Sequence, residues 1–393
     1  MRLRWKDSSA CRGQTEGLPL PNEKKNASEK PFCLPSGQGA SERRTWWRWG
    51  GLFLFLALLL LLTAVAQALL TPHIRKDAPE SFLLKEYFES DGNHDVIFLG
   101  DCEVYEAFSP AVLWEDYGIE SWVCGTPQQL LWHSYTILEE ILRRETPRVV
   151  VLGVYALSYD EPQSEAYNRM ALEALPCTGN KWRGVRVAMT EGESILSYFV
   201  PLLRYHDRWQ SLSWQDVRSL FEMQEKISTH GFVVRPEVVA GATRPGHEDA
   251  PLIPQTSFGQ MPLAYLQKIE ALCREQNIQL ILVKAPTDSW RYPWYEEYEN
   301  WTEGLAAEMV VPYYNFLEAY DEIGLDREKD SCDGGFHLNV SGAEKLTRYF
   351  GAILSECYGV PDRRGEKELA KEWEATLTQY NKWKESGKET PAE

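Results

Sequence analysis

The chain has 393 residues, of which 44% are hydrophobic and 12% aromatic, so it is long enough to bury a sizeable core. Its formal net charge is −17, but residues 1–50 carry a net of +5 and the remainder a net of −22. An acidic body argues against a nucleic-acid binder, because phosphates need a basic footprint.

Residues 1–50 are rich in glycine, proline, serine and charge, and we expect a disordered, basic cytoplasmic tail. Residues 51–70 follow as 20 uncharged residues, "GLFLFLALLLLLTAVAQALL". At about 1.5 Å per residue this run spans roughly 30 Å, the thickness of a bilayer core. Trp46, Trp47 and Trp49 precede it as an interfacial aromatic belt would.

The apolar run therefore predicts one uncleaved transmembrane anchor, a cell-membrane location and an extracytoplasmic body. Two alternatives remain. One is a buried helix of a soluble protein, and the other is a signal peptide, because Ala64-Val65-Ala66 and Ala66-Gln67-Ala68 have the small-x-small form.

Residues 77–361 are predicted to form the main domain, in which apolar strands alternate with amphipathic helices. The expected strands cover 95–100, 119–125, 148–157, 278–286 and 309–316, and the expected helices cover 127–147, 262–277 and 341–358. This alternation predicts an α/β fold, a three-layer doubly wound parallel sheet of the flavodoxin type. Ligands bind at the carboxyl ends of the strands in such sheets.

Two further segments flank this pattern. Residues 158–258 show little strand signal and predict a mostly helical insertion after the third strand, placed to cap an active site. Residues 362–393 are charged and predict a solvated helix followed by disorder.

The eight cysteines form no Cys-x-x-Cys pair and no zinc-like spacing with histidine. We therefore expect neither a metal nor a cofactor.

The first expected strand ends in "FLGDCE", which places Asp101 and Cys102 at its carboxyl end. The last expected helix is preceded by "DSCDGGFHLN", which contains Asp333 and His337, and Ser341 is its expected N-cap. A nucleophile needs a base within hydrogen-bond reach, and the base needs an acceptor that fixes its tautomer. A thiol facing a helix N-terminus would also have its thiolate favoured.

These two stretches resemble the first and last signature blocks of the SGNH (GDSL-like) hydrolase superfamily. The chain looks closest to its membrane-anchored branch, which is similar to the DltD-like and alginate-acetylation proteins and acts on cell-envelope polymers beside membrane-bound O-acyltransferases. The resemblance implies that Cys102 is the nucleophile, His337 the general base and Asp333 its orienting carboxylate. It also implies Asp101 and Gly125 as oxyanion or substrate-binding residues, since glycine lets the backbone approach an oxyanion.

The chain departs from the family pattern at three points. Cysteine replaces serine, the Asp333-x-x-x-His337 spacing is one residue longer, and the asparagine expected after the third strand is absent. The glycines between Asp333 and His337 could absorb the extra residue, or Asp330 could be the acid. Asn168 is the substitute for the missing asparagine.

Two other segments carry candidate ligand contacts. Arg204 and His206 lie in "RYHDRW", which is either an anion- or sugar-recognising lid or an exposed helix face with internal ion pairs. The aromatic residues of 284–301 suit either carbohydrate rings or core packing.

The favoured function is an esterase or O-acyltransferase that acts on a cell-envelope glycan or similar ester through an acyl-Cys102 intermediate. The alternative is a catalytically weak binding or scaffold protein that presents polymer to a membrane-bound O-acyltransferase. A Cys102 side chain within hydrogen-bond reach of His337 favours the first, and one buried away from it favours the second.

Overall fold

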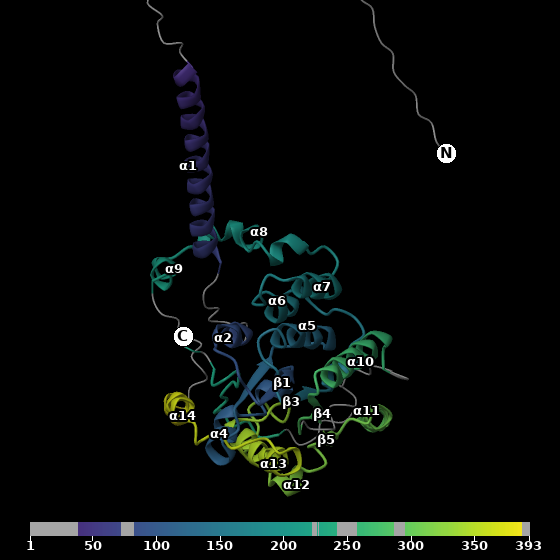
Figure 1. Ribbon diagram of the computed structural model, residues 1–393. Helices are drawn as coiled ribbons and strands as arrows, with labels where there is room; N and C mark the ends of the chain where they lie inside the picture. Colours follow the sequence, from purple (N-terminus) through teal and green to yellow (C-terminus); the bar gives the residue numbers. More distant parts are fainter. Residues whose placement is uncertain are drawn as a thin grey trace, which may run out of the picture. The chain divides into compact units, whose positions relative to one another are not determined.

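The computed structural model describes residues 38–71, 82–221, 226, 228–241, 258–286 and 295–386 (Figure 1). The chain divides into two compact units, 1–61 and 62–393. Helix α1, Gln38–Leu70, contains a stretch, Trp49–Leu70, that is long and apolar enough to cross a membrane. The helix begins before the predicted span, within the segment expected to be a tail, and residues 1–37 of that tail lie outside the described residues.

The sheet has five parallel strands in the order β2-β1-β3-β4-β5, which confirms the predicted doubly wound fold. The strands are β1 Val96–Gly100, β2 Ser121–Gly125, β3 Val149–Gly153, β4 Gln279–Lys284 and β5 Tyr313–Asn315. The strand order reverses direction between β1 and β3, and this is the switch point at which ligands bind in such sheets. The residues that follow β1 are Asp101 and Cys102.

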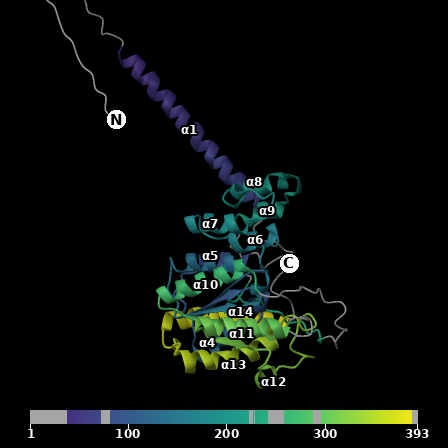
Figure 2. The same ribbon diagram turned by 90° about the vertical axis from the view of Figure 1, so that its right-hand side faces the viewer.

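Alternate strand residues enter two separate cores because side chains on a strand point to opposite faces. Phe98 packs in one core, which is covered by α4 Pro110–Tyr117 and α13 Val340–Tyr358. Its neighbour Leu99 packs in the other, which is covered by α5 Leu131–Ile141 and α10 Gln260–Glu275. Figures 1 and 2 show these helices as layers on opposite sides of the sheet.

The remaining helices of the main domain are short or lie at its margins. They are α2 Leu83–Glu89, α3 Cys102–Tyr105, α11 Tyr295–Met309 and α12 Tyr320–Ile323.

The segment after β3 is helical in the part of it that the structure describes, as predicted. It contains α6 Glu165–Leu172, α7 Gly179–Ala188, α8 Leu202–Tyr205 and α9 Trp214–Ser219, with short 3-10 helices between them. Helix α7 packs against α5, and α6 packs against both, so this part of the insertion adds a layer outside α5 (Figure 2). Residues 228–241 then return to the main domain, where Val123 N donates to His230 O and Val233 N to Tyr105 O.

The C-terminal helix α14, Lys367–Ser386, is not the fully solvated helix that its charge predicts. Trp373, Tyr380 and Trp383 are buried, and the Trp373 ring stacks on Trp114 with centroids 5.2 Å apart. Residues seven and ten positions after Trp373 fall on nearly the same side of a helix, so these aromatic side chains, with Leu369 and Leu377, dock an otherwise charged segment on the core.

Candidate functional site

Cys102 is held at the carboxyl edge of the sheet by a sharp turn from β1 into α3. Asp101 caps that helix, and its carboxylate accepts a hydrogen bond of 3.1 Å from the backbone of Glu103. Gly100 precedes the turn, and a Cβ built there would lie 2.4 Å from the Val104 side chain. The strand therefore ends in glycine because the following helical turn folds back against it.

His337 is held in a closed loop between Ser331 and Leu338, which form an isolated bridge. One oxygen of Asp333 accepts from the backbone of Phe336 and His337 at 3.0 and 2.9 Å. Its other oxygen lies 2.6 Å from His337 Nδ1. The two glycines between them adopt φ values of 83° and 104°, and this left-handed backbone accommodates the longer Asp-x-x-x-His spacing.

The structure brings the three predicted catalytic residues together. Cys102 and His337 are near neighbours, because the imidazole lowers the pKa of the thiol against the effect of burial. Because Nδ1 of His337 faces Asp333, Nε2 is the nitrogen left for the thiol. Cys102 and His337 both line a small hollow, together with Glu103, Glu106, Ala107, Ala285, Pro286, Phe336 and Leu338.

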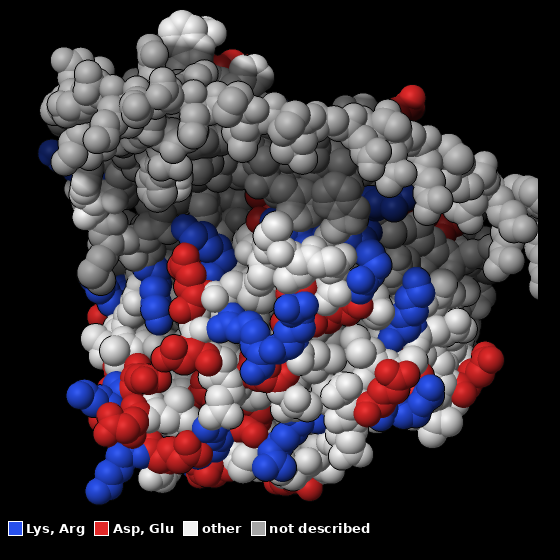
Figure 3. Space-filling view, turned by 45° about the horizontal axis from the view of Figure 1, so that its top comes forward, with Lys and Arg blue, Asp and Glu red and all other residues white. Residues whose placement is uncertain are grey.

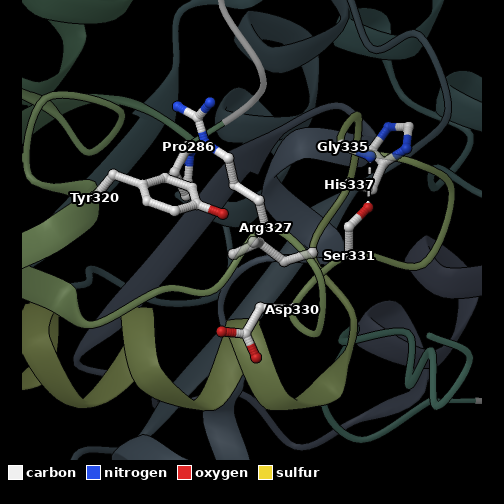
Figure 4. Close-up of a pocket in the computed structure, with 8 residues that line it drawn as sticks. Pro286, Tyr320, Arg327, Asp330, Ser331, Gly335 and His337 are labelled. Atoms are coloured by element: carbon white, nitrogen blue, oxygen red, sulfur yellow. Dashed lines mark hydrogen bonds between the residues drawn. The ribbon is translucent and has the colours of Figure 1, made fainter. Parts of the chain in front are cut away.

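Asp330, the other possible acid, is engaged elsewhere. Its buried carboxylate pairs with Lys345 at 2.6 Å and accepts from the backbone of Asp326 at 2.7 Å. Figure 4 shows the Asp330 carboxylate directed away from the His337 ring. The same view shows the Ser331 hydroxyl, which accepts a hydrogen bond from the backbone of Gly335. This bond closes the loop that carries His337.

The electrostatic surroundings favour a neutral thiol and not the thiolate expected from a helix N-terminus. Burial and then the Asp101 carboxylate raise the pKa of Cys102 to about 11, against the lowering effect of His337. Helix α3 has only four residues, so its dipole adds little. Burial is the largest single effect on His337 and lowers its pKa, but the bond to Asp333 and the interactions with Cys102 and Glu106 together outweigh burial and raise that pKa to about 12. At neutral pH, imidazolium therefore faces thiol.

Glu106 is a site residue that the sequence analysis missed. It lies one helical turn after Cys102, and its buried carboxylate is 3.9 Å from His337 Nδ1 and 3.0 Å from Arg235. The i, i+4 spacing from Cys102 could have identified it. No sequence signal identifies Arg235, because it comes from the return segment of the insertion.

The predicted N-cap of α13 is displaced by two residues. Asn339, and not Ser341, caps the helix, and its side chain accepts from Gly342 N at 3.1 Å. Asn339 is buried and also donates to the backbone of Lys329 at 2.7 Å. The cap fixes the loop that carries His337 relative to the helix.

Gly125, a predicted oxyanion residue, lies at the same sheet edge as Cys102. It ends β2 in register with Gly100, and a Cβ there would lie 3.1 Å from both Gly100 O and Tyr105 Cβ. Close packing is therefore a steric reason for glycine at position 125, in addition to the predicted approach of the backbone to an oxyanion.

The other three predicted ligand-binding residues make their contacts within α5 and the insertion. Asn168 is buried, and its amide bonds to His133 Nε2 at 3.1 Å and to Ala188 O at 2.6 Å. Arg204 pairs with Glu165 at 3.3 Å. His206 Nδ1 lies 3.2 Å from Leu203 O. The Arg204–Glu165 ion pair is of the kind that the second interpretation of "RYHDRW" expects, and ligand binding by Arg204 and His206 stays a prediction.

The aromatic segment 284–301 is only partly described, because residues 287–294 lie outside the described residues. Within the described part, Tyr298 is buried in the core beneath α10 and donates to Val154 O. That residue therefore packs in the core, as one of the two alternatives predicts.

Comparisons with known proteins add little to this geometry. No family model and no curated protein matches the chain. Among solved structures, a candidate lipolytic protein of the G-D-S-L family from Desulfitobacterium hafniense DCB-2 is 14% identical, with a TM-score of 0.31, over 67% of this chain and 100% of its own. A candidate GDSL-like lipase from Parabacteroides merdae ATCC 43184 is 11% identical, with a TM-score of 0.32, over 69% and 98%. Similarity at this level leaves fold and function to be argued from the chain's own geometry.

Proposed function

We propose that the protein is a membrane-anchored esterase or O-acyltransferase in which Cys102 takes up the acyl group. The observation that carries this proposal is the arrangement of His337, which lines one hollow together with Cys102 and whose Nδ1 lies 2.6 Å from Asp333. A nucleophile, a base and a group that orients the base are the parts that acyl transfer requires.

The proposed reaction has two steps. His337 Nε2 takes the proton of the Cys102 thiol as sulfur attacks the ester carbonyl, and the proton then passes to the departing alkoxide, which leaves a thioester. Water, or a hydroxyl of an acceptor, next attacks the thioester with His337 again as base and restores the thiol. Asp333 orients the imidazole and stabilises its positive charge in both steps.

The charge state of the site sets the pH dependence of this chemistry. With the pKa of His337 raised to about 12, little of the imidazole is in the neutral form that can accept the thiol proton at pH 7. Turnover should therefore rise with pH above neutral.

The substrate class and location are part of the proposal. The resemblance in "FLGDCE" and "DSCDGGFHLN" supports an acylated cell-envelope polymer as substrate and a membrane-bound O-acyltransferase as partner. The apolar stretch Trp49–Leu70 supports a single-pass anchor. On the face in Figure 3, basic and acidic side chains are interspersed, so its described residues offer no continuous basic track for a phosphate backbone.

A second candidate is the binding or scaffold protein, and one observation favours it. Burial and acidic neighbours keep Cys102 in its thiol form, with a pKa of about 11, which suits a site that holds an ester without cleaving it. The Cys-His-Asp geometry would then position polymer for another enzyme.

The discriminating experiment uses the full-length protein in detergent with p-nitrophenyl acetate and an O-acetylated polysaccharide. We expect ester cleavage by wild type, and loss of several orders of magnitude of rate in Cys102→Ala and His337→Gln. Cys177→Ala removes an exposed thiol and should leave the rate unchanged. Equal rates in wild type and Cys102→Ala would reject the acyl-Cys102 proposal. Binding of the polysaccharide without cleavage would favour the scaffold.

A further inference from the structure

A second cluster of ionisable side chains lies at the opposite edge of the sheet from Cys102. His94 precedes β1, Glu120 directly precedes β2, and His230 comes from the return segment of the insertion. One ligand atom from each of the three residues lies within 4.8 Å of the others. His94 and Glu120 are buried, and His230 is partly exposed.

Each of these three side chains also bonds to a partner outside the cluster, and that bond orients it. His94 Nδ1 bonds to Glu145 at 2.9 Å, which leaves Nε2 facing Glu120 Oε1 at 3.8 Å. His230 Nδ1 lies 3.3 Å from Ser121 O, and that contact does not engage its Nε2. Outer bonds of this kind are what fix the tautomer of a metal-binding histidine.

The second carboxylate oxygen of Glu120 also has a hydrogen-bond partner. Trp373 Nε1 donates to Glu120 Oε2, so Oε1 is the oxygen that faces His94. The Trp373 ring lies against the His230 ring, with centroids 4.1 Å apart. The cluster is thus enclosed by the C-terminal helix that the sequence predicted to be solvated.

The backbone at His230 and the following glycine adopts a left-handed conformation. His230 has φ 56°, and Gly231 has φ 82°. A Cβ at Gly231 would lie 1.8 Å from Val123 O, so only glycine fits against β2 at that point. A backbone conformation of high energy persists only where the surrounding structure stabilises it, and such conformations are concentrated at functional sites.

We propose that His94, Glu120 and His230 form a binding site for a divalent transition metal, with Zn²⁺ the ion that it fits best. Two imidazoles and one carboxylate are a common zinc ligand set, and water can complete the tetrahedron. The Glu120 and Glu145 carboxylates balance the charge of the ion. The metal joins the segments before β1 and β2 to the return segment and, through Trp373, to α14.

The test measures metal binding in the full-length protein, purified without a histidine tag, stripped with EDTA and reloaded with Zn²⁺ or Co²⁺. We expect one equivalent of zinc by mass spectrometry of the metal, and a visible ligand-field spectrum of four-coordinate Co²⁺. His94→Gln, Glu120→Gln and His230→Gln should each abolish stoichiometric binding. Glu145→Gln should weaken it about 10–100-fold, because it removes only an orienting partner.

His206→Gln is the matched control, because it removes an exposed histidine outside the cluster, and it should bind like wild type. Zinc should also raise the Tm of wild type by about 5 °C at a hundredfold excess over Kd, and not that of folded ligand variants. If reloaded wild type holds no stoichiometric zinc, or if folded ligand variants bind as wild type does, the proposal is wrong. The Glu145→Gln and Co²⁺ measurements decide the matter should the ligand variants not fold.

Discussion

Replacing Asp333 with asparagine tests the electrostatics of the site. Asp333→Asn removes the negative charge 2.6 Å from His337 Nδ1, while its amide oxygen can still accept from the backbone of Phe336 and His337. An opposite charge at this range shifts a pKa by about 1–3 units, and a half-exposed carboxylate lies within that range. We therefore expect the pKa of His337 to fall by about 2 units, or roughly 3 kcal/mol of preference for imidazolium.

The measurement is the ring-nitrogen NMR spectrum of the full-length protein labelled in histidine, recorded from pH 6 to 10, with His337 assigned from His337→Gln. Wild type should show imidazolium throughout, and Asp333→Asn should show the neutral ring growing at the upper end. Asp330→Asn, which removes the Lys345 partner, is the control and should leave the His337 signal unchanged. A neutral His337 in wild type at pH 8, or identical signals in wild type and Asp333→Asn, would refute the reasoning.

Four further predictions follow from the same structure. Asp101→Asn should lower the pKa of Cys102 and speed its alkylation by iodoacetamide at pH 9, because Asp101 is the largest raising effect after burial, and an unchanged rate would contradict this. Trp373→Ala should lower the free energy of unfolding by about 3–5 kcal/mol in urea titration, since it opens a cavity beneath α14, and a change under 1 kcal/mol would mean that α14 is not docked. His337 holds its proton more tightly when folded, so its contribution to stability should be complete below about pH 6.5 and decline toward about pH 12. The difference between wild type and His337→Gln in urea should accordingly shrink between pH 6 and 10, and a constant difference would oppose this. Finally, protease added to intact cells should remove the body and spare the basic tail, whereas digestion only after lysis would reverse the proposed orientation.

The fold was largely predictable because its signal is repeated along the chain. Five short apolar runs predict strands, and amphipathic segments at 127–147, 262–277 and 341–358 separate or follow them, so several independent segments indicate the same parallel sheet. The packing of α14 against the core was not predictable from composition. Its three buried aromatic residues are few compared with the charged residues of 367–386.

The candidate site was predictable only where its residues lie close to strand ends or in a short loop. Cys102, Asp333 and His337 are of this kind: Asp333 lies 2.6 Å from His337, and His337 lines one hollow with Cys102. Arg235 and Asn168 depend on the path of the insertion, which has no periodic signal that fixes it. The cluster of His94, Glu120 and His230 is drawn from three distant segments, so a search for close Cys/His spacing could not find it.

The most direct test of the account is whether Cys102 becomes acylated. Full-length wild type is mixed with p-nitrophenyl acetate at pH 8–9, quenched in acid and digested, and the acetyl content of each cysteine is measured by mass spectrometry. The exposed Cys177 and Cys357 report the background reactivity of thiols in the same sample. We predict acetyl-Cys102 well above that background in wild type and at background in His337→Gln. Ester cleavage by wild type with Cys102 no more acetylated than Cys177 and Cys357 would contradict the account.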